Sequence, residues 1–141
     1  MQIGATSDEA VANRCVFVIA GCEISRTALQ FMLQDEYETH EWSTVDQALG
    51  SLRQRRPDVV IAGVNELNAA GASAMDRIRK ACPKTRILVM VGAPSGHEDR
   101  PWLAMGAHGL LPQPLTVETV RRKVRWALGL RTALAISVKA G

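Results

Sequence analysis

The side chains best suited to metal binding or catalysis are spread thinly along this chain of 141 residues. Its three histidines are His40, His97 and His108. They fall on separate predicted elements and share no spacing, whereas a metal site or a catalytic centre needs several such groups to converge. We therefore predict neither a metal site nor a catalytic histidine, and we expect all three to be ordinary surface residues.

The cysteines lead to a similar expectation. Cys15, Cys22 and Cys82 are odd in number and lack CxxC spacing, so neither a disulfide nor a cysteine-bound metal is predicted, and free thiols fit a reducing cytoplasm. Cys22 follows the first predicted strand, and we expect it to be buried or half-buried, with a redox or ligand-binding role as the alternative. Because no pair of titratable groups converges at the predicted strand ends, we expect no enzyme activity and no cofactor.

The composition is that of a globular domain, with 47% apolar and 22% charged residues. The length fits one domain, and no apolar run is long enough to cross a bilayer. The net charge of +3 is uneven, because residues 114–141 carry +5 and residues 1–113 carry −2. This basic character belongs to the last predicted helix. It indicates a solvated helix face, with nucleic-acid binding as the alternative.

Four short apolar runs and one short mixed stretch, residues 37–43, predict the strands that position any functional side chain. They are residues 15–20, 37–43, 57–64, 86–91 and 109–111. In the third run, Val59, Val60 and Ile61 follow one another without polar residues between them. This pattern is typical of a central parallel strand that helices cover on both faces.

Helices are predicted between these strands. They lie over residues 24–35, after a cap at Ser43 or Thr44, over residues 72–81, near residues 102–105, and after a cap at Thr116. The first helix has Phe31 among its regularly spaced apolar residues, and the last has Val117 on its inner stripe. Residues 65–71 are predicted to form a loop. The regular alternation of strands and helices predicts an α/β fold with a parallel sheet.

Three stretches, taken in register, resemble the receiver domain of bacterial two-component response regulators. They are residues 55–61, Gly71 with residues 76–80, and residues 105–111 followed by Gln113-Pro114. The resemblance covers residues 15–128 and implies a flavodoxin-like (CheY-like) three-layer sandwich, whose five-stranded parallel sheet has the strand order 2-1-3-4-5. Residues 1–14 would be a disordered lead-in, and residues 129–141 an extension of the last helix or a tail.

The resemblance also implies five functional groups, and none of them matches the family pattern. They are the phospho-accepting aspartate, at Gly63; the magnesium-binding acidic pair, at Ala20 and Gly21; the hydroxyl residue, at Val91; the lysine, at Gln113; and the aromatic switch residue, at Leu110. Acyl-phosphate formation needs a carboxylate nucleophile, a magnesium ion held by carboxylates, and a neutralising cation. We therefore predict a degenerate, phosphorylation-independent pseudo-receiver. If the alignment of the first strand with the family is wrong by one or two residues, Glu23 would lie in the site and supply one acid. Asp58 is expected at the opposite end of the sheet.

The ending of the last predicted strand, residues 109–115, is also similar to the atypical receivers of ANTAR-type antitermination regulators. Receivers often have a cis peptide bond before the proline that corresponds to Pro114, and a Gln-Pro bond adopts this isomer at little cost. ANTAR-type regulators continue into a coiled coil and an RNA-binding domain, which this sequence lacks. It is therefore either a free-standing relative or a fragment.

The resemblance places the output on the face formed by the fourth helix, the fifth strand and the fifth helix. The candidate interface residues are Trp102, Leu110, Arg121, Arg122, Arg125 and Trp126. Tryptophan is enriched at interface centres, although core packing explains the two tryptophans equally well. We predict a cytoplasmic signalling module that regulates transcription through protein–protein binding and forms a homodimer. An RNA-binding regulator that uses the basic last helix and a small-molecule sensor that uses the vacated pocket are the alternatives.

Overall fold

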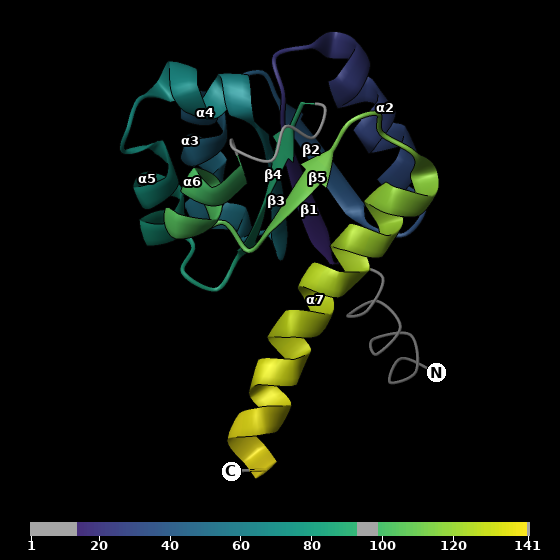
Figure 1. Ribbon diagram of the computed structural model, residues 1–141, viewed down its shortest axis with the longest axis vertical. Coiled ribbons are helices and arrows are strands. Elements are labelled where there is room, and N and C mark those ends of the chain that lie inside the picture. The colour runs from purple at the N-terminus through teal and green to yellow at the C-terminus, as the bar shows by residue number, and fades with distance from the viewer. Residues whose placement is uncertain (1–13, 93–98, 141) are drawn as a thin grey trace.

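The structure, a computed structural model, describes residues 14–92 and 99–140, which form a five-stranded parallel sheet between two layers of helices (Figure 1). The strands are β1 (Cys15–Ile19), β2 (Glu38–Trp42), β3 (Val59–Gly63), β4 (Arg86–Val91) and β5 (Gly109–Pro112). They are hydrogen-bonded in the order β2-β1-β3-β4-β5, and every neighbouring pair is parallel. The predicted fold class and strand order are confirmed.

The helices divide between the two faces of the sheet. They are α2 (Glu23–Leu33), α3 (Val45–Arg55), α4 (Val64–Ala70), α5 (Ala74–Ala81), α6 (Asp99–Ala104) and α7 (Val117–Ala140). Figure 1 shows α3, α4, α5 and α6 on one face, with α2 and α7 on the other. Most of the predicted lead-in, residues 1–13, lies outside the described residues. Within the described ranges, no helix has both the length and the apolar character of a membrane-spanning segment.

Each face of the sheet has its own apolar core, and β3 contributes to both. Val60 and Ala62 pack with α3, α4 and α5, whereas Val59 and Ile61 pack with α2 and α7. All four side chains are fully buried. Because successive residues of a strand point to opposite faces, a strand buried on both sides must be apolar throughout. This explains the run without polar residues.

Two predicted helix caps are confirmed. The Oγ1 atom of Thr44 accepts a hydrogen bond from the backbone N–H of Gln47 at 3.2 Å, so Thr44 and not Ser43 caps α3. Thr116 Oγ1 accepts a hydrogen bond from the N–H of Thr119 at 3.1 Å, at the start of α7. Each cap satisfies one of the N–H groups that the first turn of a helix leaves free.

The predicted loop over residues 65–71 is wrong, because the chain forms α4 directly after β3. Gly63 is both the last residue of β3 and the N-cap of α4, so no linker separates the two elements. The buried side chain of Leu67 anchors the helix, and Gly71 ends it with a φ of 103°. Seven residues with two asparagines, Asn65 and Asn68, are too few to show a helical period against their turn-like composition.

Two predicted inner residues are also wrong. Phe31 of α2 is 71% exposed and Val117 of α7 is 42% exposed. The inner face of α2 carries Leu29 and Leu33 instead, and that of α7 carries Val120 and three later residues. Helix α7 has 24 residues, which corresponds to a length of about 36 Å, and it extends well beyond the edge of the sheet (Figure 1).

Two glycine substitutions test the assignment of α4. Gly71→Ala is expected to destabilise the protein by about 1–2 kcal/mol, because an L-residue strains at this positive φ. Gly50→Ala, inside α3, is expected to stabilise it by about 0.5–1 kcal/mol, because glycine weakens a helix interior. A Cβ at either glycine meets no atom within 4 Å, so the comparison isolates backbone conformation. Urea unfolding measures both effects, and equal effects would contradict the helical end at Gly71.

Candidate functional site

The residues predicted to form the vacated phosphorylation site lie at one edge of the sheet. Gly63 ends β3, Ala20 and Gly21 follow β1, Val91 ends β4, and Gln113 follows β5. Since the strands are parallel, all five are at the carboxyl edge. Here β1 leads to α2 on one face and β3 leads to α4 on the other, so the edge contains the topological switch point at which α/β proteins commonly bind ligands. We call these five residues the vacated site.

Within the described residues, the carboxylate of Glu66 enters the vacated site, and the sequence analysis missed it. Glu66 lies in the first turn of α4. A Cβ atom at Gly21 would be 2.7 Å from Oε2 of Glu66, and a Cβ at Gly63 would overlap Oε1. The carboxylate therefore covers both glycines and uses the space that side chains at these positions would need. It is the third residue of a helix, a position from which a glutamate side chain can reach back toward the helix N-terminus.

The Arg26 side chain of α2 is held by polar contacts at the ends of β1 and β2, next to the vacated site. Its Nη1 atom donates hydrogen bonds to the carbonyl oxygen of Ala20 at 2.8 Å and to Ser43 Oγ at 3.3 Å. Its Nε atom is 3.1 Å from Oε1 of Glu41 on β2. This arrangement ties α2 to the ends of β1 and β2, and it commits the guanidinium group to partners other than a ligand of the vacated site.

Cys22 lies beside the vacated site, but it is exposed and not buried as predicted. It is the N-cap of α2, where free backbone N–H groups stabilise a thiolate. The pKa of its thiol is lowered chiefly by the backbone N–H of Ser25, and also by the Ser25 hydroxyl and the N–H of Ile24. The charge of Glu66 acts in the opposite direction and raises this pKa. Glu23, the other acid expected near this edge, is exposed at the first position of α2.

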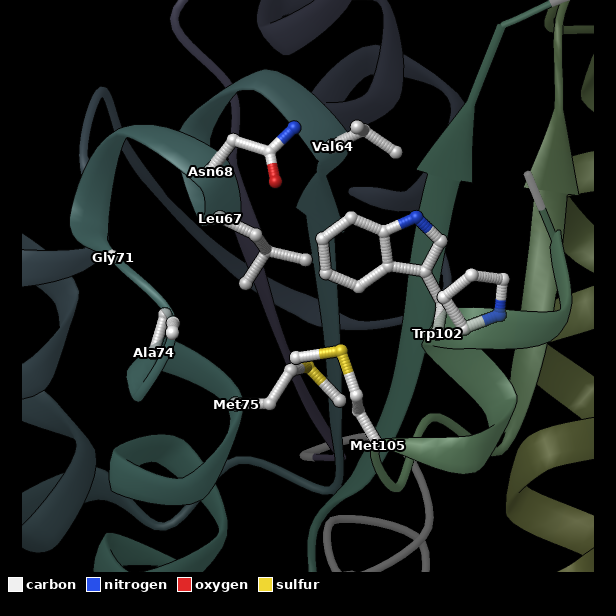
Figure 2. A pocket seen from close by; sticks show the side chains of 10 residues that line it. Val64, Leu67, Asn68, Gly71, Ala74, Met75, Trp102 and Met105 are labelled. Atoms are coloured by element: carbon white, nitrogen blue, oxygen red, sulfur yellow. The ribbon is translucent and has the colours of Figure 1, made fainter.

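A cleft of about 730 Å³ opens between α4, α5 and α6 (Figure 2). Its walls are mainly apolar, with Val64 and Leu67 on α4, Met75 on α5, and Trp102 on α6. Figure 2 shows the Trp102 ring facing α4, above the Met75 and Met105 side chains. At 9% exposure, Trp102 belongs to the core on this side of the sheet. Core packing, the alternative given for Trp102, therefore describes its position, and its ring also forms part of the wall of this cleft.

The other candidate interface residues separate into two groups. Trp126 is 44% exposed and packs against β5, where a Cβ at Gly109 would be 2.7 Å from its ring. Arg122 is exposed as well, and Leu110 is half-buried against the α3–α6 core. By contrast, the Nε atom of Arg121 donates to the carbonyl of Met32 at 3.0 Å, and Arg125 pairs with Glu36 at 3.5 Å. These two arginines hold α7 against the end of α2.

The histidines differ from the expected surface residues. His40 and His108 are half-buried, and His97 lies outside the described residues. Nδ1 of His108 accepts a hydrogen bond from the N–H of Ile87 at 3.0 Å, which ties β4 to the start of β5. Burial, Arg86 and Arg79 lower the pKa of His108, so it remains neutral through a wider pH range than a free histidine. The Gln113–Pro114 peptide bond is cis, the isomer that the resemblance implies.

The reactivity of Cys22 tests the geometry of the vacated site. We expect Cys22 to react with iodoacetamide at lower pH than an ordinary thiol, because its pKa is lowered, while the buried Cys15 and Cys82 stay unmodified. Glu66→Gln is expected to shift the pH profile further down, since it removes a charge that disfavours the thiolate. Glu118→Gln removes an exposed acid that does not act on the Cys22 thiol, and this control is expected to change nothing. Peptide mass spectrometry measures each rate, and equal profiles in all three proteins would contradict the placement of Glu66.

A search of curated protein sequences gave no match. Solved structures share the fold. NtrX from Brucella abortus in complex with ADP is 19% identical with a TM-score of 0.80, over 91% of this chain but only 29% of the NtrX chain. The signal receiver domain of a putative LuxO repressor protein from Vibrio parahaemolyticus is 14% identical with a TM-score of 0.77, over 89% and 97% of the two chains. The chemotaxis response regulator CheY4 of Vibrio cholerae is 24% identical with a TM-score of 0.74, over 82% of this chain and 99% of the CheY4 chain.

The family assignment comes from the sequence match. The response regulator receiver domain family matches residues 16–125, from β1 into α7, and so covers most of the chain. The solved receivers have the same fold over most of this chain, and two of them are matched over nearly their whole length. The chain belongs to the response regulator receiver domain family.

Proposed function

We propose that this protein is a pseudo-receiver: a receiver domain that acts in signal transduction by binding a protein partner and is not controlled by phosphorylation. The observation that supports this most directly is that the Glu66 carboxylate lies against Gly63 at the carboxyl end of β3. The acceptor position has no side chain, and a carboxylate from α4 covers it.

The residues around Gly63 do not supply the chemistry of phosphoryl transfer. An acyl phosphate forms on a carboxylate nucleophile, and magnesium offsets the charge of the phosphoryl group. Ala20 and Gly21 offer no carboxylate to a metal ion, and Val91 has no hydroxyl group. Gln113 is neutral, so it cannot neutralise a transferred phosphoryl group as a lysine would. We therefore propose that the domain has no enzymatic or autophosphorylating activity.

Glu66 adds a second obstacle. Its carboxylate lies in the space above Gly63 and Gly21, where a phosphoryl group would have to bind. Two like charges close together in a partly buried site repel each other, since the local dielectric constant is well below that of water. In this account the Glu66 carboxylate keeps a phosphoryl group out of the site, so the state of the domain does not depend on phosphate donors.

The proposed output surface is the face formed by α6, β5 and α7. Its exposed side chains include Leu103 on α6 and Trp126 and Arg122 on α7, and Lys123 Nζ lies 5.5 Å from the centre of the Trp126 ring. Exposed tryptophan and arginine side chains are common at the centres of protein interfaces. We propose that a second copy of the chain binds here to form a homodimer. The ANTAR-like ending of β5 is consistent with a role in transcription regulation.

The RNA-binding and sensor alternatives have less support. RNA binding through α7 would use its basic residues, but Arg121 and Arg125 are already engaged by the end of α2. A sensor would bind its ligand in the vacated site, where Glu66 fills part of the space. We therefore favour protein binding.

Light scattering coupled to size-exclusion chromatography tests both parts of this proposal. Over a concentration series, the mass is expected to rise from 15.3 kDa toward twice that value, because the exposed face buries apolar area on self-association. The curves with and without acetyl phosphate and Mg²⁺ are expected to coincide. A mass that changes with acetyl phosphate would contradict phosphorylation independence.

Three variants locate the interface in the same measurement. Trp126→Ala is expected to keep the protein monomeric, whereas Phe31→Ala, which removes an even more exposed aromatic group on α2, is expected to leave the dimer intact. Arg122→Glu provides a second change on the proposed face, at a side chain that does not pack in the core. Dissociation by Phe31→Ala alone would place the interface on α2. A wild-type monomer at every concentration would exclude the homodimer and leave an adaptor for another protein.

A further inference from the structure

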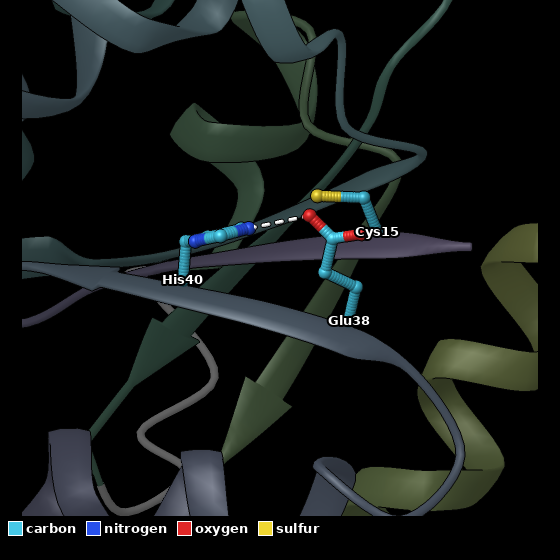
Figure 3. A group of neighbouring side chains, drawn as sticks. All are labelled: Cys15, Glu38 and His40. Carbon is cyan, nitrogen blue, oxygen red and sulfur yellow. Dashed lines mark hydrogen bonds and ion pairs between the residues drawn. The ribbon is translucent and has the colours of Figure 1, made fainter. Parts of the chain in front are cut away.

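Three metal-binding side chains converge at the amino edge of the sheet, opposite the vacated site (Figure 3). Cys15 is the first residue of β1, Glu38 is the first residue of β2, and the two are direct partners in the sheet. His40 is two residues further along β2 and therefore points to the same face as Glu38. The cysteine Sγ, a carboxylate oxygen and an imidazole nitrogen all lie within 4.8 Å of one another.

The donor set suits one class of metal ion. Thiolate, imidazole and carboxylate groups together bind Zn²⁺ and related transition metals, whereas Mg²⁺ and Ca²⁺ require oxygen ligands. Zinc–ligand bonds of about 2.0–2.3 Å place neighbouring ligand atoms about 3–4 Å apart. Small side-chain movements from the present arrangement would reach this spacing. Three protein ligands leave a fourth tetrahedral position for water or for an external ligand.

The surrounding structure holds these ligands in place. The ring of Phe17 packs against the edge of the His40 ring at 5.8 Å between centroids, and the Trp42 ring lies 6.0 Å away. The backbone N–H of Cys15 donates to Oδ2 of Asp58 at 2.9 Å. The Cys15 side chain is buried, with a Glu38 carboxylate oxygen within 4.8 Å of its Sγ atom and the Asp58 carboxylate bonded to its own backbone N–H. The thiol is thus next to two carboxylates, a setting that attracts a cation.

The guanidinium group of Arg55 is the cation that contacts Glu38 and His40 in the present structure. Its Nη1 atom is 3.2 Å from Oε2 of Glu38 and 3.1 Å from Nε2 of His40, and these two atoms are themselves 2.6 Å apart. Arg55 is the last residue of α3, and its side chain is 50% exposed. An exposed ion pair contributes little to stability, so the guanidinium group can turn into solvent at small cost.

We propose that Cys15, Glu38 and His40 form a binding site for one Zn²⁺ ion. On binding, the Cys15 thiol loses its proton to solvent and His40 takes the tautomer whose proton is on Nδ1. Cys15 Sγ, His40 Nε2 and a carboxylate oxygen of Glu38 then each donate a lone pair to the metal, and Arg55 leaves the cluster. The site joins the amino ends of β1 and β2. It is independent of the proposed pseudo-receiver function, because it lies at the other end of the same strands.

Cobalt titration of the full chain tests this site, with a phosphine reductant in place of thiol reductants that would bind the metal. Co²⁺ is expected to bind with a stoichiometry of one and to give the near-ultraviolet charge-transfer band of a cobalt–thiolate bond, which Zn²⁺ then removes. Cys15→Ser is expected to abolish the band, and His40→Gln to weaken binding at least about tenfold, the lower end of the loss caused even by mutation of outer-shell groups. Cys22→Ser, which removes the exposed thiol, is the matched control and should change nothing.

Arg55→Gln keeps the proposal testable if the substitution of the buried Cys15 prevents folding. Loss of the competing guanidinium group is expected to tighten Zn²⁺ binding, measured by competition with a chromogenic chelator. The proposal is overturned if wild-type protein shows no cobalt–thiolate band, or if the band is lost in Cys22→Ser and retained in Cys15→Ser. Metal binding by Arg55→Gln alone would also overturn it, because the native cluster would then be an arginine-bound ion pair.

Discussion

The packing of β3 between two apolar cores is the constraint on which the rest of the structure depends. Val59 and Ile61 face α2 and α7, while Val60 and Ala62 face the layer that contains α3, α4 and α5. Since a shift of one residue would exchange these faces, the register of β3 is strongly fixed. That register carries Gly63 to the carboxyl edge, beside the ends of β1 and β4. The immediate start of α4 then brings Glu66 back over Gly63.

The two edges of the sheet shift the pKa of the cysteine beside them in opposite directions. At the amino edge, burial and two carboxylates raise the pKa of Cys15 to about 12. At the carboxyl edge, the N-terminus of α2 offers hydrogen-bond donors, and the pKa of the exposed Cys22 is lowered. The five-residue strand β1 thus lies between two different thiols. A nearby cation would favour ionisation of the Cys15 thiol, whereas the Cys22 thiol already ionises more readily than an ordinary cysteine. The difference arises from local structure, because the thiol chemistry of the two residues is identical.

The sequence predicts β1, β3, β4 and β5 well because they are apolar runs next to glycine or proline, and this pattern reports burial directly. The edge strand β2 has a mixed composition and gives a weaker signal. The face of a helix is harder to predict. Phe31 and Val117 fit the helical period, but the positions that α2 and α7 bury depend on how the two helices pack against the sheet. Helix α4 was missed because a short helix with no linker gives no periodic signal.

The vacated site was predictable as a set of missing groups, whereas its occupant was not. Gly63, Ala20, Gly21, Val91 and Gln113 follow from the ends of the strands, but Glu66 reaches them only through the geometry of α4. The cluster of Cys15, Glu38 and His40 was missed for a related reason. Two of these residues are direct partners in neighbouring strands but far apart in sequence, and only the pairing of β1 with β2 brings them together.

The most direct measurement of the central claim is the intact mass of the protein after incubation with acetyl phosphate and Mg²⁺, recorded under conditions that preserve acyl phosphates. The account predicts no phosphoryl adduct on either the wild-type protein or Glu66→Gln. A stoichiometric adduct on the wild-type protein would contradict it. Loss of that adduct in Glu66→Gln would identify Glu66 as the phosphoryl acceptor and the protein as a receiver with a relocated carboxylate.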